Sequence, residues 1–277
     1  MEIISGPGGL ECMHLSHGSG ASLLIARYGG HILSWKTAEG RERFFLSERT
    51  VYAPGKAIRG GVPVIFPQFS DHGPYPRHGF ARRMTWSLVE GVDPDAALLE
   101  LTDSAATLAE WPYPFRLRLG AELSATELTL RLSLENTGPQ AMPFHAALHG
   151  YLALAEVTAT RIAGLAGRDF HNEVTKQREL DSDAAITLGR EVDRAYCGAG
   201  GSRIGFHNGD AEGSLEIEAE GFPDLVVWNP GPDHGLGDLT PDGWRAFVCV
   251  EAARIEGTEP LPAGATWTGT QTFRSGG

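Results

Sequence analysis

One histidine and one glutamate stand where the surrounding sequence predicts burial. His149 lies in the apolar, strand-like run FHAALHGYLAL at residues 144–154. Glu251 follows the apolar residues FVCV, so we expect a carboxylate at the end of a core strand. Buried carboxylates and imidazoles need partners. Because such a pair can donate and accept protons, general acid–base catalysis is one interpretation. The other interpretation is a structural ion pair, in the core or at its rim, in which the two side chains bond to their neighbours and do no chemistry.

A second group of polar residues lies in the stretch 58–86, IRGGVPVIFPQFSDHGPYPRHGFARRMTW. Two clusters, one at Arg59 and one from His78 to Arg82, flank a loop rich in proline, glycine and aromatic residues. This composition excludes a regular helix. Since buried Arg and His require polar partners, we expect this stretch to line a pocket for a small anion. The alternative is a surface loop with incidental charges.

Two histidines, His145 and His149, form the sequence HAALH, which invites comparison with zinc sites. The metalloprotease motif requires Glu directly after the first His, and here Ala146 occupies that position. The surrounding residues favour a strand, in which this even spacing places both imidazoles on one face. We therefore prefer a pocket wall to a metal site. The sequence also lacks nucleophile-elbow, Walker and dinucleotide-binding motifs, so we expect no cofactor and no metal.

The elements that must position these residues are strands. Residues 115–123 and 128–134 alternate apolar and polar side chains, which predicts an antiparallel hairpin with one face on the core. Further strand patterns recur at 22–35, 144–154, 215–219, 224–228, 247–250 and 267–273, and residues 105–111 form the best short helix candidate. No linker or repeat divides the chain. We therefore predict one all-β domain over residues 1–277, a large antiparallel sandwich or a barrel.

Composition narrows the range of partners. The chain has 23 Lys and Arg against 35 Asp and Glu, a formal net charge of −12, which argues against nucleic acids and anionic membranes. No apolar run is long enough to span a bilayer, and no signal peptide is evident. The three cysteines, Cys12, Cys197 and Cys249, lie far apart and are expected to be reduced thiols. We expect a cytoplasmic monomer.

Six motifs in order resemble one known family. They are IRGGVPVIFPQF, RHGFAR, ALHGYL, EVDRAY, VVWNP and FVCVE. Together they resemble the hexose-6-phosphate mutarotases, or glucose-6-phosphate 1-epimerases, of the aldose 1-epimerase superfamily. The resemblance covers most of the chain and implies a galactose mutarotase-like β-sandwich. It also implies an isomerase that interconverts the α and β anomers of a hexose 6-phosphate, most simply glucose 6-phosphate.

The resemblance assigns roles residue by residue. His149 and Glu251 match the catalytic pair, with Glu251 as the base and His149 as the acid that opens the sugar ring. Arg59 and Arg82 match the arginines around the sugar phosphate. Two further residues are implied in substrate binding, Asp193 in EVDRAY and His78 in RHGFAR.

The chain departs from the family pattern at two places. Arg77 stands where members often have Gln, so a third arginine is expected to contact the substrate. The ending FVCVEAARI lacks the Pro-Gly pair that follows this Glu in many members. Four aromatic residues are candidates for stacking on the sugar: Trp35, Phe66, Phe80 and Trp228.

Three other functions stay open on the sequence alone. One is a sugar-phosphate-binding protein on the same scaffold without catalysis. Another is an aldose 1-epimerase for an unphosphorylated sugar. The third is a different carbohydrate enzyme, such as a glycoside hydrolase or lyase, although most glycosidases use two suitably spaced carboxylates.

Overall fold

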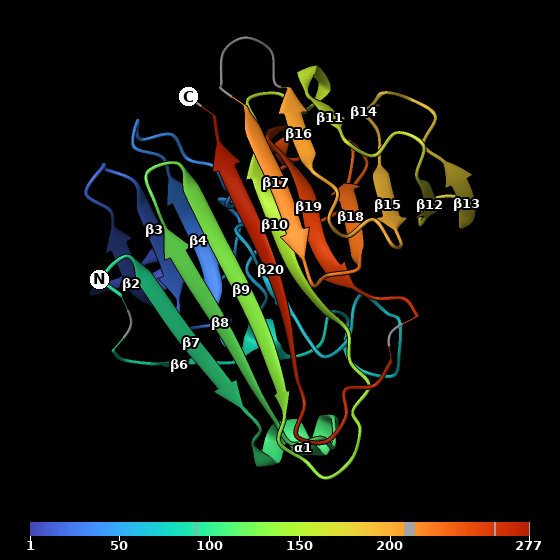
Figure 1. Cartoon of the computed structure of the whole chain (residues 1–277). Coiled ribbons are helices and arrows are strands. Elements are labelled where there is room, and N and C mark those ends of the chain that lie inside the picture. Colours follow the sequence, from blue (N-terminus) through green and yellow to red (C-terminus); the bar gives the residue numbers. More distant parts are fainter. Residues whose placement is uncertain (92, 208–213, 258, 277) are drawn as a thin grey trace.

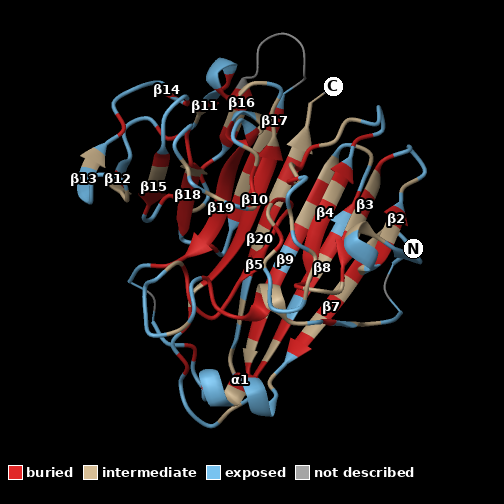
Figure 2. Ribbon diagram, turned by 180° about the vertical axis from the view of Figure 1, so that it is seen from behind, coloured by how far each residue is buried: buried red, intermediate tan, exposed pale blue. Residues whose placement is uncertain are grey.

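The protein is built from three antiparallel sheets, as a computed structural model of the chain shows (Figure 1). The structure describes residues 1–91, 93–207, 214–257 and 259–276. A nine-stranded sheet forms one layer. A seven-stranded and a four-stranded sheet lie beside one another in the opposite layer (Figures 1 and 2). The prediction of a large all-β sandwich is therefore confirmed.

The seven-stranded sheet carries the candidate site. Its strands in spatial order are β13 (Gln177–Leu180), β12 (Asp169–Asn172), β15 (Val192–Tyr196), β18 (Asp224–Asn229), β19 (Phe247–Arg254), β10 (Ala146–Ala153) and β5 (Val64–Ile65). Strands β10 and β19 are buried at nearly every position (Figure 2). This burial explains their apolar, non-alternating sequences.

The other two sheets supply the opposite layer and the N-terminal part of the core. The nine-stranded sheet has the order β14 (Ala185–Thr187), β11 (Arg161–Ala163), β16 (Ile204–His207), β17 (Leu215–Glu220), β20 (Thr266–Ser275), β9 (Glu127–Asn136), β8 (Phe115–Leu123), β7 (Ala96–Thr102) and β6 (Ser87–Leu88). The four-stranded sheet comprises β1 (Glu2–Ser5), β2 (Glu11–Ser16), β3 (Ser22–Ala26) and β4 (His31–Lys36).

The predicted hairpin is confirmed as β8 and β9. Leu117 pairs with Leu134 and Leu119 with Leu132, and these side chains are fully buried. Each buried leucine contributes roughly 1.5–3 kcal/mol of hydrophobic stabilisation relative to an exposed one. The alternating pattern therefore fixes which face of this sheet meets the other layer.

Helices are few in the described part of the chain. The expected short helix is α1 (Ala105–Glu110), whose N-terminus is capped by Ser104 and Thr107 in a reciprocal capping box. Four single turns of 3-10 helix complete the set: η1 (Pro7–Gly9), η2 (Ala81–Arg83), η3 (Val157–Ala159) and η5 (Gly243–Ala246). No helix among the described residues is both long and apolar enough to cross a membrane.

One sequence expectation is wrong and another is confirmed. Glu251 was expected at the end of a strand, but β19 continues to Arg254, so the carboxylate sits in the middle of the sheet. The strand persists because Glu251 keeps a register partner on each side, His149 on β10 and Val226 on β18. The stretch 58–86 is irregular as expected, interrupted only by β5, η2 and isolated bridges before β6 begins.

Candidate active site

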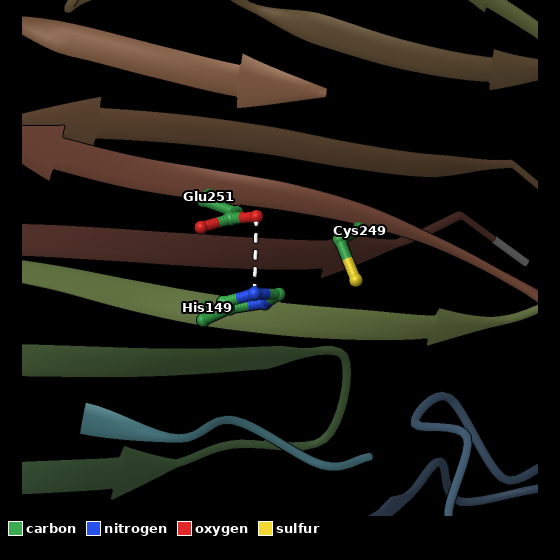
Figure 3. A group of neighbouring side chains, drawn as sticks. All are labelled: His149, Cys249 and Glu251. Atoms are coloured by element: carbon green, nitrogen blue, oxygen red, sulfur yellow. Dashed lines mark ion pairs between the residues drawn. The ribbon is translucent and has the colours of Figure 1, made fainter. Parts of the chain in front are cut away.

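The centre of the site is a pair of side chains brought together by strand register. His149 on β10 lies directly opposite Glu251 on β19, although 102 residues separate them (251 − 149 = 102). Register partners on one face of a sheet have neighbouring side chains. The His149 Nε2 atom is 3.3 Å from Glu251 Oε1, and the two side chains are only 8% and 2% exposed (Figure 3). The structure thus joins the two residues that the sequence proposed as a pair.

Burial shifts the proton affinities of the pair in opposite directions. Burial, reinforced by the negative charge of Asp193, raises the pKa of Glu251 well above its usual range. Burial, together with the positive charges of Arg82 and Arg59, lowers the pKa of His149 well below its usual range. A raised pKa makes the carboxylate a stronger base, and a lowered pKa makes the imidazolium a stronger acid.

The imidazole of His149 is held by aromatic neighbours. Tyr151 stacks on it with ring centroids 4.9 Å apart and an interplanar angle of 8°. Trp228 and His78 meet it edge-on, at 6.0 Å and 5.6 Å. These contacts fix the plane of the ring, so Nε2 faces Glu251 without reorganisation. Such preorganisation is what proton transfer at a defined atom requires.

The pair lies on the floor of a cavity of about 440 Å³. All seven residues that the sequence singled out line this cavity: Arg59, Arg77, His78, Arg82, His149, Asp193 and Glu251. The volume suits a monosaccharide-sized ligand, since small-molecule pockets usually measure roughly 300–1,000 Å³. His145 is not among the lining residues; its Nδ1 accepts a hydrogen bond from the Phe69 backbone N–H at 3.3 Å.

One wall of the cavity is made by the loop 57–82, whose backbone is unusual. Among the described residues, three non-glycine positions have positive φ: Ser70 (43°), His78 (62°) and Lys176 (59°). All three line the cavity, Ser70 and His78 from this loop and Lys176 from the opposite wall. Non-glycine residues in this region are strained by roughly 1–3 kcal/mol and cluster at functional sites. The wall is therefore shaped at a cost in stability.

The arginines of this wall differ in their partners. Arg59 donates to Asp238 Oδ1 at 3.1 Å and to the Tyr151 hydroxyl at 2.9 Å. Burial alone would lower the pKa of Arg59, but Tyr151 and Asp238 raise it above its usual value. Arg59 is thus a paired cation.

Arg82 forms no ion pair with a carboxylate of the described residues. It donates to the Arg77 carbonyl at 3.0 Å, while its buried Nε has no hydrogen-bond partner in the part of the chain described. Burial lowers the pKa of Arg82 to about 10, and the charges of Arg83, Arg59 and Arg77 act in the same direction. A half-buried, incompletely bonded guanidinium favours an incoming anion. Arg77 is more exposed and forms an ion pair with Asp71.

The opposite wall carries acidic groups. Asp193 on β15 lies beside Trp228 in the register and faces the cavity. Burial, with a contribution from Glu173, raises the pKa of Asp193 from 3.8 to about 6. Glu173 accepts a hydrogen bond from Lys176 Nζ at 2.8 Å at the tip of the β12–β13 hairpin. This wall therefore offers hydrogen-bond acceptors for sugar hydroxyls.

Sequence reasoning missed several lining residues, notably Tyr151, Glu173, Lys176 and Asp238. Tyr151 had a detectable signal, because it follows His149 at i+2 and so shares its face of the strand. The other three lie in turns or loops without a recognisable pattern. Among the aromatic candidates for stacking, Trp228 lines the cavity, whereas Trp35, Phe66 and Phe80 are buried in the core cluster.

Comparison with known proteins identifies the family. The family model described as aldose 1-epimerase matches residues 11–274. A protein of Cenchrus ciliaris that carries the provisional name glucose-6-phosphate 1-epimerase is 33% identical over 282 residues, which cover 97% of this chain and 85% of that protein. A protein of Escherichia coli K12 with the same provisional name is 33% identical over 245 residues, covering 86% and 81% of the two chains.

Solved structures agree with this result. The crystal structure of a protein of Salmonella typhimurium, provisionally named a mutarotase, superposes with a TM-score of 0.84 at 27% identity. The match covers 100% of this chain and 97% of that one. A protein of Synechocystis sp. PCC 6803 has the same fold, with a TM-score of 0.83 at 23% identity and coverage of 100% and 99%. On these matches, the chain belongs to the aldose 1-epimerase family.

Proposed function

We propose that this protein is an enzyme that interconverts the α and β anomers of a hexose 6-phosphate, with glucose 6-phosphate as the first candidate. The observation that carries this proposal is the buried His149–Glu251 pair on the floor of a polar cavity, with the incompletely bonded Arg82 in its wall. The names of the relatives from Cenchrus ciliaris and Escherichia coli support the same activity.

The proposed reaction needs one proton acceptor and one proton donor. Glu251 removes the proton of the C1 hydroxyl while His149 protonates the ring oxygen, so the C1–O5 bond breaks and a free aldehyde forms. Rotation about the C1–C2 bond presents the other face of the aldehyde. Closure returns the O5 proton to His149 and the Glu251 proton to the C1 oxygen. Each cycle leaves the protein in its original protonation state.

The geometry of the pair suits this sequence of steps. Both groups are buried, so their opposite pKa shifts bring the donor and the acceptor closer in strength to the sugar oxygens they serve. Acid–base groups placed in this way typically contribute 10²–10⁴-fold each to the rate. The buried Glu251 Oε2 has no hydrogen-bond partner among the described residues and is available to a substrate hydroxyl.

Arg82 is proposed as the principal phosphate-binding residue. A charge-assisted hydrogen bond contributes about 1.5–3 kcal/mol, and a guanidinium can form two of them with one phosphate. Arg59 and Arg77 add positive charge nearby but already have carboxylate partners. His78 and Asp193 are proposed to bind sugar hydroxyls, and Trp228 to stack on the apolar face of the ring. We propose that residues 1–277 act as one domain and as a monomer.

The test is anomer exchange measured by NMR exchange spectroscopy on glucose 6-phosphate and on glucose. We expect faster exchange for the phosphorylated sugar at equal concentrations. Equal acceleration of both sugars would instead favour an aldose 1-epimerase without phosphate selectivity. Tight binding of glucose 6-phosphate without any acceleration would favour a binding protein, and would contradict the proposed catalysis.

A further inference from the structure

One chemically reactive group beside the dyad has no part in the proposed reaction. Cys249 lies on β19 two residues before Glu251, and thus on the same face of the strand. Its register partners are Tyr151 on β10 and Trp228 on β18, both of which line the cavity. The thiol is fully buried and unpaired. Anomer exchange as described above does not need it.

The thiol completes a compact set of three donors. The Cys249 Sγ atom and one ligand atom each from His149 and Glu251 all lie within 4.8 Å of one another (Figure 3). Zinc binds sulfur at about 2.3 Å and nitrogen or oxygen at about 2.0–2.2 Å, so two N/O ligands of a tetrahedral ion stand about 3.3 Å apart. The distance from His149 Nε2 to Glu251 Oε1 is 3.3 Å. A tetrahedral ion places its sulfur ligand about 3.5 Å from the nitrogen and oxygen ligands, so the Cys249 sulfur must move toward the other two donors when the ion binds.

Access to the donors and a spare ligand atom are also present. An ion can reach the donors, because His149 and Glu251 form part of the cavity lining. Glu251 Oε2 is buried without a hydrogen-bond partner among the described residues, so the carboxylate has a spare ligand atom. One thiolate, one imidazole and one carboxylate form a ligand set that suits Zn²⁺ and excludes the harder Mg²⁺ and Ca²⁺.

We propose that His149, Cys249 and Glu251 form an inhibitory binding site for Zn²⁺ or a similar thiophilic divalent cation. When the ion binds, the Cys249 thiol and the His149–Glu251 pair each release one proton to the solvent. Three protein–metal bonds form in their place. No electron is transferred. The ion occupies the donor atoms that act on the sugar, so it excludes catalysis. The inhibition rests on the proposed function, whereas binding of the ion does not.

Zn²⁺ binds cysteine as the thiolate, so the Cys249 thiol gives up its proton to the solvent when the ion binds. Metal binding must displace this proton, and the affinity therefore increases with pH. This dependence separates the site from exposed carboxylates, which are already ionised at neutral pH.

The experiment measures binding of Zn²⁺ by equilibrium dialysis and of Co²⁺ by its thiolate charge-transfer absorption, using the full chain. We expect one ion per chain and the cobalt–thiolate band. Cys249→Ala and Cys249→Ser should each weaken Zn²⁺ binding by about 100-fold or more and abolish the band. Cys197→Ala is the matched control, because Cys197 is exposed and is not part of the cluster. It should leave both signals unchanged.

The outcomes are distinguishable. Loss of the band in the folded Cys249→Ser variant, verified by circular dichroism, supports the site even if no sugar substrate is ever identified. Unchanged Zn²⁺ affinity in both Cys249 variants, or no binding by wild type at millimolar Zn²⁺, overturns the proposal. If Zn²⁺ binds through Cys249 but leaves glucose 6-phosphate exchange intact, the site is not inhibitory and that part of the proposal is wrong.

Discussion

The two sides of the cavity are built differently. Its floor consists of strands β10, β19 and β18, which carry His149, Glu251 and Trp228. One wall is the irregular loop 57–82, which carries Arg59, Arg77, His78 and Arg82. The side chains of His149 and Glu251 in the floor are 8% and 2% exposed, whereas Arg77 in the wall is 60% exposed.

The difference between floor and wall matches a difference between catalysis and ligand selection. Groups that exchange protons must stay at fixed distances, and a central sheet hydrogen-bonded on both sides provides that rigidity. Groups that select a ligand benefit from a loop, because loops tolerate substitution without disturbing the core. We therefore expect changes in the floor to affect the rate and changes in the wall to affect substrate choice.

The largest effect is expected in the floor. Glu251→Gln removes the proposed base while preserving the size of the side chain, so kcat/KM for glucose 6-phosphate should fall by about 10²–10⁴-fold. NMR exchange spectroscopy gives the rate, and circular dichroism checks the fold. Glu122→Gln, on the far end of β8, is the control. Exchange at the wild-type rate in Glu251→Gln would refute the assignment of the base.

A smaller and selective effect is expected in the wall. Arg82→Ala should weaken glucose 6-phosphate binding by about 10–100-fold, the equivalent of one or two charge-assisted hydrogen bonds, and leave the binding of glucose nearly unchanged. Titration calorimetry and exchange rates with both sugars measure this. Arg59→Ala should disturb both sugars, because Arg59 also holds the hydroxyl of Tyr151, which stacks on His149. If both variants changed the two sugars to the same extent, Arg59 and Arg82 would not have the different roles proposed for them.

The shape of the wall depends on Gly79, which has φ of 66°. A Cβ atom at this position would stand 2.1 Å from the backbone oxygen of Phe66, so the loop must shift to accept it. Gly79→Ala should lower the free energy of unfolding by about 1–3 kcal/mol and raise KM more than it lowers kcat. Chemical denaturation and steady-state kinetics test this, and Gly40→Ala, also at positive φ but with nothing near its Cβ, is the control. Equal destabilisation by both variants would show that crowding against Phe66 is unimportant.

The smallest effect concerns Asp193 and pH. Its pKa is raised from 3.8 to about 6 by burial and by Glu173, so the folded state prefers the protonated form. The stability this provides is complete below about pH 4 and is lost as the pH rises through about 6. Asp193→Asn should therefore be more stable than wild type at pH 7.5, by at most about 3 kcal/mol, and equally stable near pH 4.

Urea denaturation at the two pH values measures this difference. Since Asp193 also raises the pKa of Glu251, the acid limb of the kcat/KM profile should move to lower pH in the same variant. A constant stability difference across this pH range would argue that folding does not raise the pKa of Asp193.

Local sequence patterns predicted much of the fold. Strict alternation in residues 115–134 predicted the β8–β9 hairpin, because a strand with one buried face must repeat every two residues. A pattern of this kind says little about strands buried on both faces. Residues 247–250 therefore predicted a strand but not its continuation through Glu251 to Arg254.

The candidate site was predicted in its residues but not in its geometry. Residue types and motif order singled out seven positions, and all seven line one cavity. The sequence alone thus determined the family, the strand-rich fold and the chemical groups available. Only the tertiary structure decided that His149 faces Glu251 and that Cys249 lies beside them. It also decided that Arg59 has a carboxylate partner, whereas Arg82 has none among the described residues. The reason is that register and ion pairing join residues far apart in the chain, and no local pattern encodes such partners.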